Sequence, residues 1–312
     1  MIPRRLILAA LAVAAPAASQ QPPVFRAEVK LVRVLATVKN AGGEPVGSLD
    51  PGSFQIFDNG VPQTLAIFEH HTEQPLSIAL LIDTSGSTGI QLQYETDSVN
   101  RFVRALFAEG NPRDALALFS FNWETTLLAG FTRQAEPIEK SLRGIKSEGG
   151  TSLYDALYLA AWRLQPREGR HIIVVVTDGG DTTSVKNYNQ AIQAVLMADT
   201  VIYPVLVVPI ENDAGRNIGG EHALATMAQR SGGQVFLPSL GEQIDAAFAG
   251  ILHDLRSQYL LGYYPRGVPA TKDPFHRIEI KLKRPDLRVS ARSGYYGEAE
   301  QDRGWTPVRP KR

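Results

Sequence analysis

The spacing of apolar and polar residues changes along the chain, and each spacing predicts a different kind of structure. Over residues 76–257, continuous apolar runs alternate with helical patterns, which is typical of a parallel sheet covered by helices on both faces. A short run at 125–131 closely follows the strand before it, so we expect it to be an antiparallel edge strand. The runs predict buried strands at 76–82, 115–121, 171–177, 201–208 and 234–237.

Between these strands, apolar residues recur three and four positions apart, which places them on one face of a helix. The residues of three such faces are Val99, Phe102, Val103, Leu106 and Phe107; Leu157, Ala160, Ala161 and Leu164; and Ile244, Phe248, Ile251, Leu252 and Leu255. Strands and helices together predict an α/β fold with a doubly wound, mostly parallel sheet of the Rossmann-like kind.

On both sides of this region the apolar period is two, which predicts half-buried β-strands. The predicted strands lie at 25–38, 54–57 and 64–68 before the region, and at 259–264, 278–282 and 287–291 after it. The apolar alternation changes phase once within 25–38, as it does at a bulge. An Asn59-Gly60 pair predicts a hairpin between the second and third strands, and residues 284–286 predict a turn.

Neither flank has enough apolar residues to bury a core alone, so we expect the two flanks to form one small β-sandwich. The predicted organisation is a first sandwich segment at 25–72, an inserted α/β domain at 74–257 and a second sandwich segment at 258–297. Residues 298–312 contain proline and charge without periodicity, and we expect a flexible tail.

Residues 1–19 have the layout of a signal peptide. Arg4 and Arg5 precede an apolar stretch at 6–15, and small residues suited to cleavage follow. This stretch is shorter than the roughly 20 residues needed to span a hydrocarbon core of about 30 Å. We therefore expect cleavage, an exported protein of the periplasm or the extracellular space, and no stable membrane insertion afterwards.

Composition narrows the range of partners and chemistries. The 32 Lys and Arg residues balance 32 Asp and Glu residues, so no overall field attracts nucleic acid, and we expect no nucleic-acid partner. The chain has no cysteine, which excludes disulfides and thiol chemistry.

Three predicted loops carry oxygen-bearing side chains toward one edge of the sheet. Asp83, Ser85 and Ser87 follow the first buried strand, and Asp178 follows the third parallel strand. Thr151, after a Gly-Gly pair, begins the helix that leads into that strand. Because ligands of open parallel sheets bind beyond the carboxyl ends of the strands, we expect these residues to lie close together.

This set has two carboxylates and three hydroxyls, with neither histidine nor cysteine. Oxygen ligands favour Mg²⁺, Mn²⁺ or Ca²⁺ over Zn²⁺ or copper. A cation held mainly by neutral hydroxyls keeps enough positive character to bind one more anion. The residues therefore predict an incompletely coordinated cation that accepts a carboxylate from outside the chain.

In order and spacing, the five residues resemble the metal-ion-dependent adhesion site (MIDAS) of von Willebrand factor type A (VWFA) domains. The resemblance covers about residues 74–257. It implies that the three hydroxyl residues bind the ion directly or nearly so, that the two aspartates act largely through water, and that the sheet has one antiparallel edge strand. The flanking segments are similar to exported bacterial proteins called VWFA-related, best known from Acidobacteria.

These observations predict a non-enzymatic binding or adhesion protein whose metal ion docks an Asp or Glu of a protein partner. Two alternatives stay open. One is a structural envelope scaffold with a vestigial ion site. The other is a metal-dependent hydrolase, for which Asp181 and Glu148 are the available general bases. The chain has no Gly-x-Ser-x-Gly, Gly-x-Gly-x-x-Gly or His-Glu-x-x-His motif.

Overall fold

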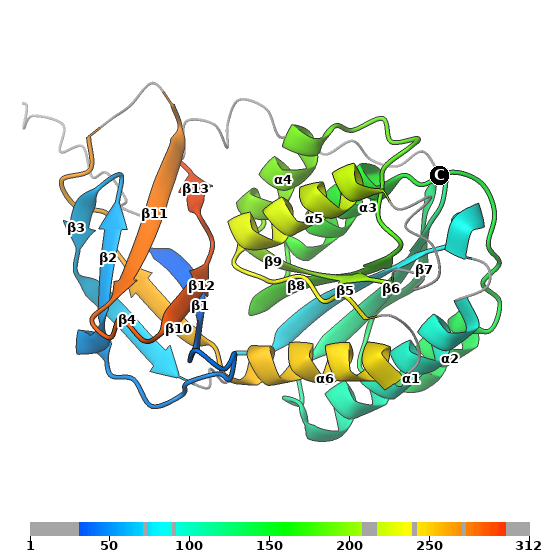
Figure 1. Ribbon diagram of the computed structural model, residues 1–312, viewed down its shortest axis with the longest axis horizontal. Helices are drawn as coiled ribbons and strands as arrows, with labels where there is room; N and C mark the ends of the chain where they lie inside the picture. Colours follow the sequence, from blue (N-terminus) through cyan, green and yellow to red (C-terminus); the bar gives the residue numbers. More distant parts are fainter. Residues whose placement is uncertain are drawn as a thin grey trace, which may run out of the picture.

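The computed structural model of the protein describes residues 31–70, 74–88, 92–207, 217–238, 242–269 and 273–297. The predicted signal peptide and tail lie outside these residues, as does the first part of the predicted strand at 25–38. An α/β part and a β-sandwich lie side by side (Figure 1). The predicted fold class is confirmed, because the sandwich is built from N-terminal and C-terminal strands around the α/β part.

The sheet of the α/β part has the strand order β7-β6-β5-β8-β9. All pairs are parallel except β6 with β7, so the predicted antiparallel edge strand is confirmed. Every residue of β5, β8 and β9 is buried, as continuous apolar runs require. The strands are β5 (Leu76–Asp83), β6 (Ala115–Phe121), β7 (Thr125–Thr132), β8 (Arg170–Thr177) and β9 (Thr200–Leu206).

Helices cover both faces of this sheet, and the predicted apolar faces point into two separate cores. One core is shared by α1 (Leu92–Glu109), α2 (Ala135–Leu142) and α6 (Glu242–Arg256). The other is shared by α3 (Leu153–Leu164), α4 (Tyr188–Met197) and α5 (Ile218–Ser231). Short 3-10 turns occur at Pro51–Ser53 (η1) and Gly86–Thr88 (η2).

The fifth parallel strand predicted at 234–237 is wrong, because only one bridge forms there, between Val205 and Phe236. Phe236 donates its N–H to Pro204 O and accepts from Leu206 N, both at 2.8 Å. The next bonds of a parallel ladder would need N–H donors at positions 204 and 238. Both positions are proline, which has no N–H, so the pairing stops after one bridge.

The sandwich consists of two four-stranded sheets, ordered β12-β1-β10-β4 and β13-β11-β2-β3. Apolar residues of β1, β2, β10 and β11 form its shared core. The strands before the α/β part are β1 (Val32–Lys39), β2 (Phe54–Asp58), β3 (Val61–Gln63) and β4 (Leu65–His70). The strands after it are β10 (Tyr259–Tyr263), β11 (Phe275–Leu282), β12 (Arg288–Ala291) and β13 (Gly294–Tyr296).

The turn at Asn59-Gly60 forms as predicted, with φ of 46° and 80°, the positive values that a tight hairpin needs. Its partner strands are β2 and β3, however, and the predicted strand 64–68 continues as β4 in the other sheet. The turn at 284–286 likewise leads from β11 in one sheet to β12 in the other. Both connections cross the sandwich because each sheet recruits a strand from the opposite end of the chain.

A buried carboxylate links the two ends of the chain within the sandwich. Asp58 on β2 is 0% exposed and accepts hydrogen bonds from Tyr263 (3.0 Å) and Tyr295 (2.8 Å). Its other oxygen lies 3.1 Å from His276 Nδ1. The N-terminal and C-terminal strands are therefore joined by polar contacts as well as by a common core.

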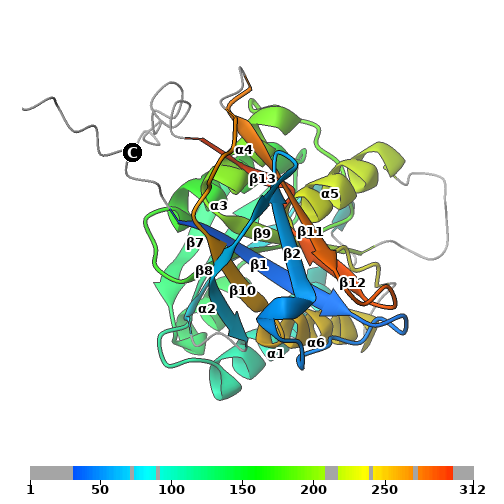
Figure 2. The same cartoon turned by 90° about the vertical axis from the view of Figure 1, so that its left-hand side faces the viewer.

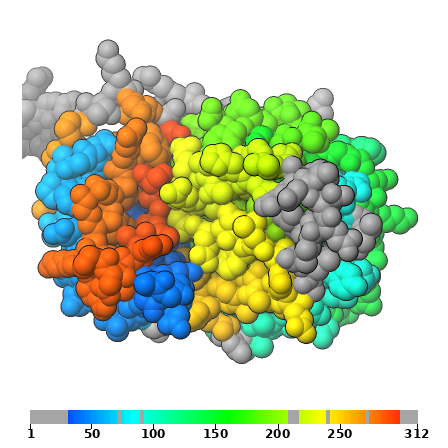
Figure 3. All heavy atoms as spheres, in the orientation of Figure 1, coloured from blue at the N-terminus to red at the C-terminus, as the bar shows by residue number. Residues whose placement is uncertain are grey.

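The sandwich packs against the end of the α/β part where the parallel strands begin (Figure 1). Leu35 of β1 and Phe275 of β11 pack against the two α/β cores. Lys39 at the end of β1 forms an ion pair with Asp254 of α6 at 2.8 Å. Figure 2 views the molecule from the sandwich side, and Figure 3 shows the C-terminal strands lying against α5. Among the described helices, none is long and apolar enough to cross a membrane.

Candidate functional site

Asp83 lies at the carboxyl end of the central strand β5 and is 0% exposed. Its Oδ1 accepts a hydrogen bond from Ser85 N at 2.8 Å. Its Oδ2 accepts one from Thr177 Oγ1 at 2.6 Å, and Thr177 is the last residue of the neighbouring strand β8. The Asp83 side chain therefore fixes the loop that follows it and ties the ends of two parallel strands together.

The two serines after Asp83 present their hydroxyls side by side. Ser85 Oγ and Ser87 Oγ are 3.1 Å apart. Ser85 is buried and Ser87 is exposed. Thr88 Oγ1 donates to Ser85 O at 2.9 Å, which closes the η2 turn between them. The β5–α1 loop thus carries one covered and one accessible hydroxyl.

The loop before α3 is bound directly to the β5–α1 loop. Glu148 N donates to Thr84 O at 2.8 Å, and Gly86 N donates to Gly149 O at 3.1 Å. Gly149 has φ of +81°, and a Cβ there would lie 2.4 Å from the Trp123 ring, so glycine is required. These bonds place Thr151, two residues further on, beside the serine loop.

Thr151 is buried, and its backbone also binds the loop after β8. Its N–H donates to Thr182 Oγ1 at 2.8 Å, and its carbonyl accepts from Thr182 N at 2.8 Å. Asp178 begins this third loop, directly after the Thr177 that binds Asp83. Among the described residues, the side chains of Thr151 and Asp178 have no hydrogen-bond partner, so their oxygens are free to bind a ligand.

The carboxyl groups at this edge repel one another. Burial raises the pKa of Asp83 to about 6, against its hydrogen bonds to Thr177 and Ser85, and the negative charge of Asp178 raises it further. A buried carboxyl group beside another negative charge favours either a proton or a nearby cation. The electrostatics of this edge therefore fit a bound cation.

One further acidic residue of this region, Glu95 in the first turn of α1, is not among the residues predicted from the sequence. It is 0% exposed, and neither carboxyl oxygen has a hydrogen-bond partner within the described part of the chain. Burial raises its pKa to about 8, with further contributions from the negative charges of Asp83 and Asp178. Its position could have identified it, because Glu95 shares the apolar face of Val99 and Phe102 at helical spacing.

The donor set requires hydroxyl ligands if a cation is to bind here. No group of three or more Asp, Glu or His side chains among the described residues is arranged to hold a metal ion. Ser85, Ser87 and Thr151 supply neutral oxygens, and the nearby acids supply uncompensated negative charge. This combination fits a hard divalent cation that is held by hydroxyls and water.

The two residues considered as general bases have different surroundings. Asp181 Oδ1 accepts hydrogen bonds from Tyr154 N at 3.1 Å and from Ser184 Oγ, so it holds the loop after β8 against α3. Glu148 is exposed. Asp181 therefore has a clear structural role in positioning the loop that carries Asp178.

The α/β part is similar to a known protein family. Residues 78–180 match the family model described as von Willebrand factor type A domain. A similar solved structure is the vWF domain of the type V pili tip protein Mfa5 from Porphyromonas gingivalis, with a TM-score of 0.49 and 15% identity. That match covers 63% of this chain and 98% of that chain.

Two other similar solved structures are also bacterial. The PilB minor pilin from Streptococcus sanguinis has a TM-score of 0.48 and 13% identity, over 59% of this chain and 62% of PilB. The chain thus spans about three fifths of that pilin's length. The conserved hypothetical protein BatB from Bacteroides thetaiotaomicron has a TM-score of 0.44 and 19% identity, over 58% of this chain and 100% of BatB. No curated protein matches the chain in sequence.

Proposed function

We propose that the protein is an exported, non-enzymatic binding protein, because residues 78–180 match the family model of the von Willebrand factor type A domain. Its α/β part holds one divalent cation and docks an acidic residue of a protein partner. The sandwich supports this part, and its strands come from the flanking segments that resemble exported bacterial VWFA-related proteins. The N-terminal signal-like segment supports a periplasmic or extracellular location.

One observation carries the proposal: hydrogen bonds join the three loops that bear the five candidate residues. The bond from Thr177 to Asp83 connects the β5 and β8 ends, and the bond from Gly86 to Gly149 connects the serine and threonine loops. Since independent loops gather around buried, mutually repelling acids, a cation would relieve a cost that the fold otherwise carries.

The residues divide into two roles in this proposal. Ser85, Ser87 and Thr151 contribute hydroxyl oxygens to the ion, while Asp83 and Asp178 orient its bound water. Mg²⁺ fits this arrangement, because it prefers six oxygen ligands and usually keeps several waters. Mn²⁺ and Ca²⁺ accept similar ligands. A carboxylate of the partner replaces one water and completes the coordination.

Calorimetric titration of the full chain with MgCl₂ and MnCl₂, after treatment with chelator, tests the ion site. We expect one ion per chain. Ser87→Ala should weaken binding at least tenfold, because an exposed hydroxyl is lost without disturbing the core. Ser290→Ala, at an exposed position of β12, is the matched control and should bind as the natural chain does. Equal binding by all three proteins would remove the ion site from the proposal.

Partner docking needs a second experiment. The immobilised chain is incubated with envelope extract in Mg²⁺, in chelator, and as the Ser87→Ala variant. We expect one or more proteins to be retained only by the natural chain in Mg²⁺, and free glutamate at high concentration to release them. If the ion binds but the partner proteins are retained equally with and without chelator, the cation has a structural role and docking occurs elsewhere.

A further inference from the structure

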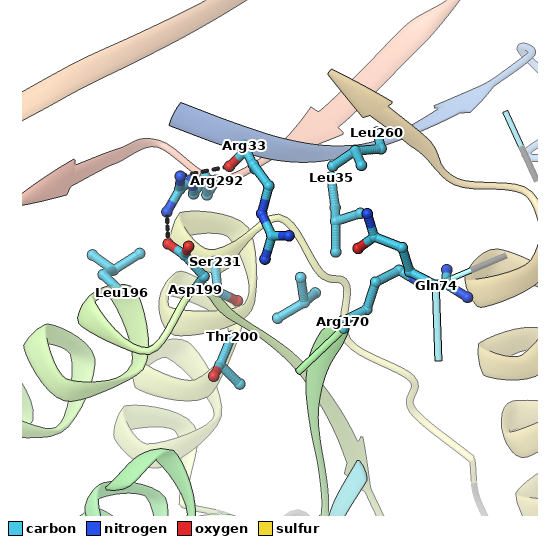
Figure 4. Close-up of a pocket in the computed structure, with 12 residues that line it drawn as sticks. Arg33, Leu35, Gln74, Arg170, Leu196, Asp199, Thr200, Ser231, Leu260 and Arg292 are labelled. Atoms are coloured by element: carbon cyan, nitrogen blue, oxygen red, sulfur yellow. Dashed lines mark hydrogen bonds and ion pairs between the residues drawn. The ribbon is translucent and has the colours of Figure 1, made fainter. Parts of the chain in front are cut away.

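A second polar region lies at the opposite end of the α/β sheet, where the sandwich packs against it. A cavity of about 30 Å³ lies there, and we call it the seam cavity. Its charged lining consists of Arg33 from β1, Arg170 from β8, Arg292 after β12 and Asp199 before β9 (Figure 4). Residues from both parts of the molecule therefore enclose one small space that is rich in arginine.

Arg170 is the most constrained of these arginines. It is 7% exposed, and one terminal nitrogen donates to Leu255 O at 2.5 Å and to Gln258 Oε1 at 3.2 Å. Its Nε has no hydrogen-bond partner within the described residues. A buried charged donor without a partner is unfavourable to the folded state. Burial also disfavours the charged form of Arg170 and lowers its pKa to about 10, although Asp114 and Tyr203 act to raise it.

Arg292 is held in place but is also incompletely bonded. It is 8% exposed, pairs with the Asp199 carboxylate, and donates to Arg33 O at 2.5 Å. Its Nε, too, lacks a partner among the residues that the structure describes. Asp199 is 48% exposed, so this side of the cavity faces solvent. A ligand entering from solvent would meet the Arg292 side chain.

Of the three arginines, Arg33 has the side chain with the fewest contacts to polar groups of the protein. It extends from β1 into the seam cavity toward the α/β part (Figure 4). In the described part of the chain, its guanidinium group has no hydrogen-bond or ion-pair partner. Leu35, two positions later on the same face of β1, packs into the α/β core. The strand thus presents Arg33 to the seam by the same alternation that buries Leu35.

The hydroxyl groups around the cavity are already engaged in hydrogen bonds. Ser231 Oγ donates to Ala228 O at 2.9 Å and accepts from Ile202 N at 3.0 Å. Thr200 Oγ1 donates to Ala198 O at 3.1 Å. The groups that remain available in the lining are therefore mainly guanidinium donors, which recognise oxyanions.

We propose that the seam cavity binds one inorganic phosphate ion, which bridges the sandwich and the α/β part. Three guanidinium groups and one carboxylate leave two positive charges in excess, which suits the charge of about −1.5 to −2 on a phosphate group near neutral pH. Three arginines from three different segments line this cavity, and several guanidinium donors suit the four oxygens of a tetrahedral ion better than the two of a carboxylate.

The size of the seam cavity favours the free ion over the phosphate group of a larger molecule. Its volume of about 30 Å³ has room for about two waters. A phosphomonoester would have to leave its organic part in the solvent beside Asp199, where it gains no contacts from the buried arginines. Free phosphate should therefore bind more tightly than glycerol 3-phosphate.

The test is calorimetric titration of the full chain, in chelator and at constant ionic strength, with phosphate, glycerol 3-phosphate and acetate. We expect one phosphate per chain and weaker binding of the other two. Arg33→Gln should weaken phosphate binding at least tenfold, since a donor without other partners is removed and the fold loses nothing. Arg33→Lys should bind phosphate more tightly than Arg33→Gln and more weakly than the natural chain, because lysine keeps the charge and loses the planar guanidinium group.

Arg288→Gln is the matched control, because Arg288 is an exposed arginine of β12 in the same part of the molecule. It should bind phosphate as the natural chain does. Absence of saturable binding would overturn the proposal, as would equal binding by Arg33→Gln. Acetate binding as tightly as phosphate would overturn the tetrahedral assignment, and tighter binding of glycerol 3-phosphate would overturn the assignment to the free ion.

Discussion

The two ends of the α/β sheet have opposite electrostatic character. At the carboxyl ends of β5 and β8, buried Asp83 and Glu95 face one another's negative charge, and Glu95 has no partner among the described residues. At the amino ends, Arg170 and Arg292 each have a buried nitrogen without a described partner. Negative charge is therefore in excess at the carboxyl ends of the strands, and positive charge is in excess at the amino ends.

This difference shows how unpartnered buried groups indicate ligand chemistry. Folding normally satisfies buried polar groups, so several exceptions of one charge type around one space favour a ligand of the opposite charge. Hydroxyls beside buried acids favour a hard cation, and several arginines around one cavity favour an oxyanion. The seam also contains a charge that is satisfied, the Lys39–Asp254 pair, which allows structural and ligand-binding charges to be separated by mutation.

The largest expected effect is on stability and concerns that satisfied pair. Lys39→Ala should lower the free energy of unfolding by about 3 kcal/mol, because it leaves a buried carboxylate unpaired. Lys283→Ala, at an exposed position, should change it by less than about 0.5 kcal/mol. Urea denaturation measures both. A loss below about 1 kcal/mol for Lys39→Ala would show that the pair does not hold the seam.

The stability of Lys39→Ala relative to the natural chain should depend on pH, in a direction set by the pKa of Asp254. Burial raises the pKa of Asp254, and Lys39 opposes this rise, so removing Lys39 raises the pKa further. The folded variant then keeps a proton that the unfolded chain has released. Its deficit relative to the natural chain should be full above the raised pKa and shrink as pH falls toward about 3.9, the ordinary aspartate value. A deficit that grows on acidification would contradict this assignment.

The second largest effect is on cation binding at the carboxyl ends of β5 and β8. Asp83→Asn should lower the affinity for Mn²⁺ at least a hundredfold, about 2.7 kcal/mol, because the change removes a negative charge while keeping the size of the side chain and one of its two acceptor oxygens. Electron paramagnetic resonance of free Mn²⁺ measures the affinity. Phosphate binding at the seam should be unchanged, and a parallel loss of both ligands would show that the variant is misfolded.

Glu95→Gln should have a smaller effect on the same ion, about fivefold or about 1 kcal/mol. Glu95 acts on the cation through its charge, whereas the hydroxyl residues bind the ion. Glu124→Gln, at an exposed position after β6, is the control and should leave Mn²⁺ affinity unchanged. If Glu95→Gln abolishes binding, Glu95 is itself a ligand, and the division of roles in the site is wrong.

The smallest expected effect is communication between the two ends. Saturating Mg²⁺ should change phosphate affinity by less than about twofold, because β5 and β8 have 8 residues each and separate the sites by about 25 Å. This separation exceeds the screening length of about 8 Å at physiological salt. Titration of phosphate with and without Mg²⁺ measures the coupling, and a larger change would show that the ends act together.

Much of the fold could be predicted because its strands are continuous apolar runs. The runs at 76–82 and 115–121 needed no knowledge of their neighbours, since strands buried on both faces have no alternation to misread. The sandwich connections could not be predicted in the same way. Whether the strand after Gly60 returns to β2 or crosses to β10 depends on strands about 200 residues away in the sequence.

Two other misses had signals within the sequence. Pro204 and Pro238 exclude the ladder predicted at 234–237, once the register of that segment against β9 is considered. Glu95 lies on the apolar face of its helix at the spacing of Val99 and Phe102. The seam arginines had none, because residues 33, 170 and 292 are brought together only by the packing of the sandwich against the sheet.

Anomalous diffraction from crystals of the full chain soaked in Mn²⁺ shows whether the three hydroxyl residues bind a cation. We expect one strong Mn²⁺ peak at the carboxyl ends of β5 and β8, about 2.0–2.6 Å from the hydroxyl oxygens of Ser85, Ser87 and Thr151. A peak bound elsewhere at saturating Mn²⁺, or none, would contradict this prediction.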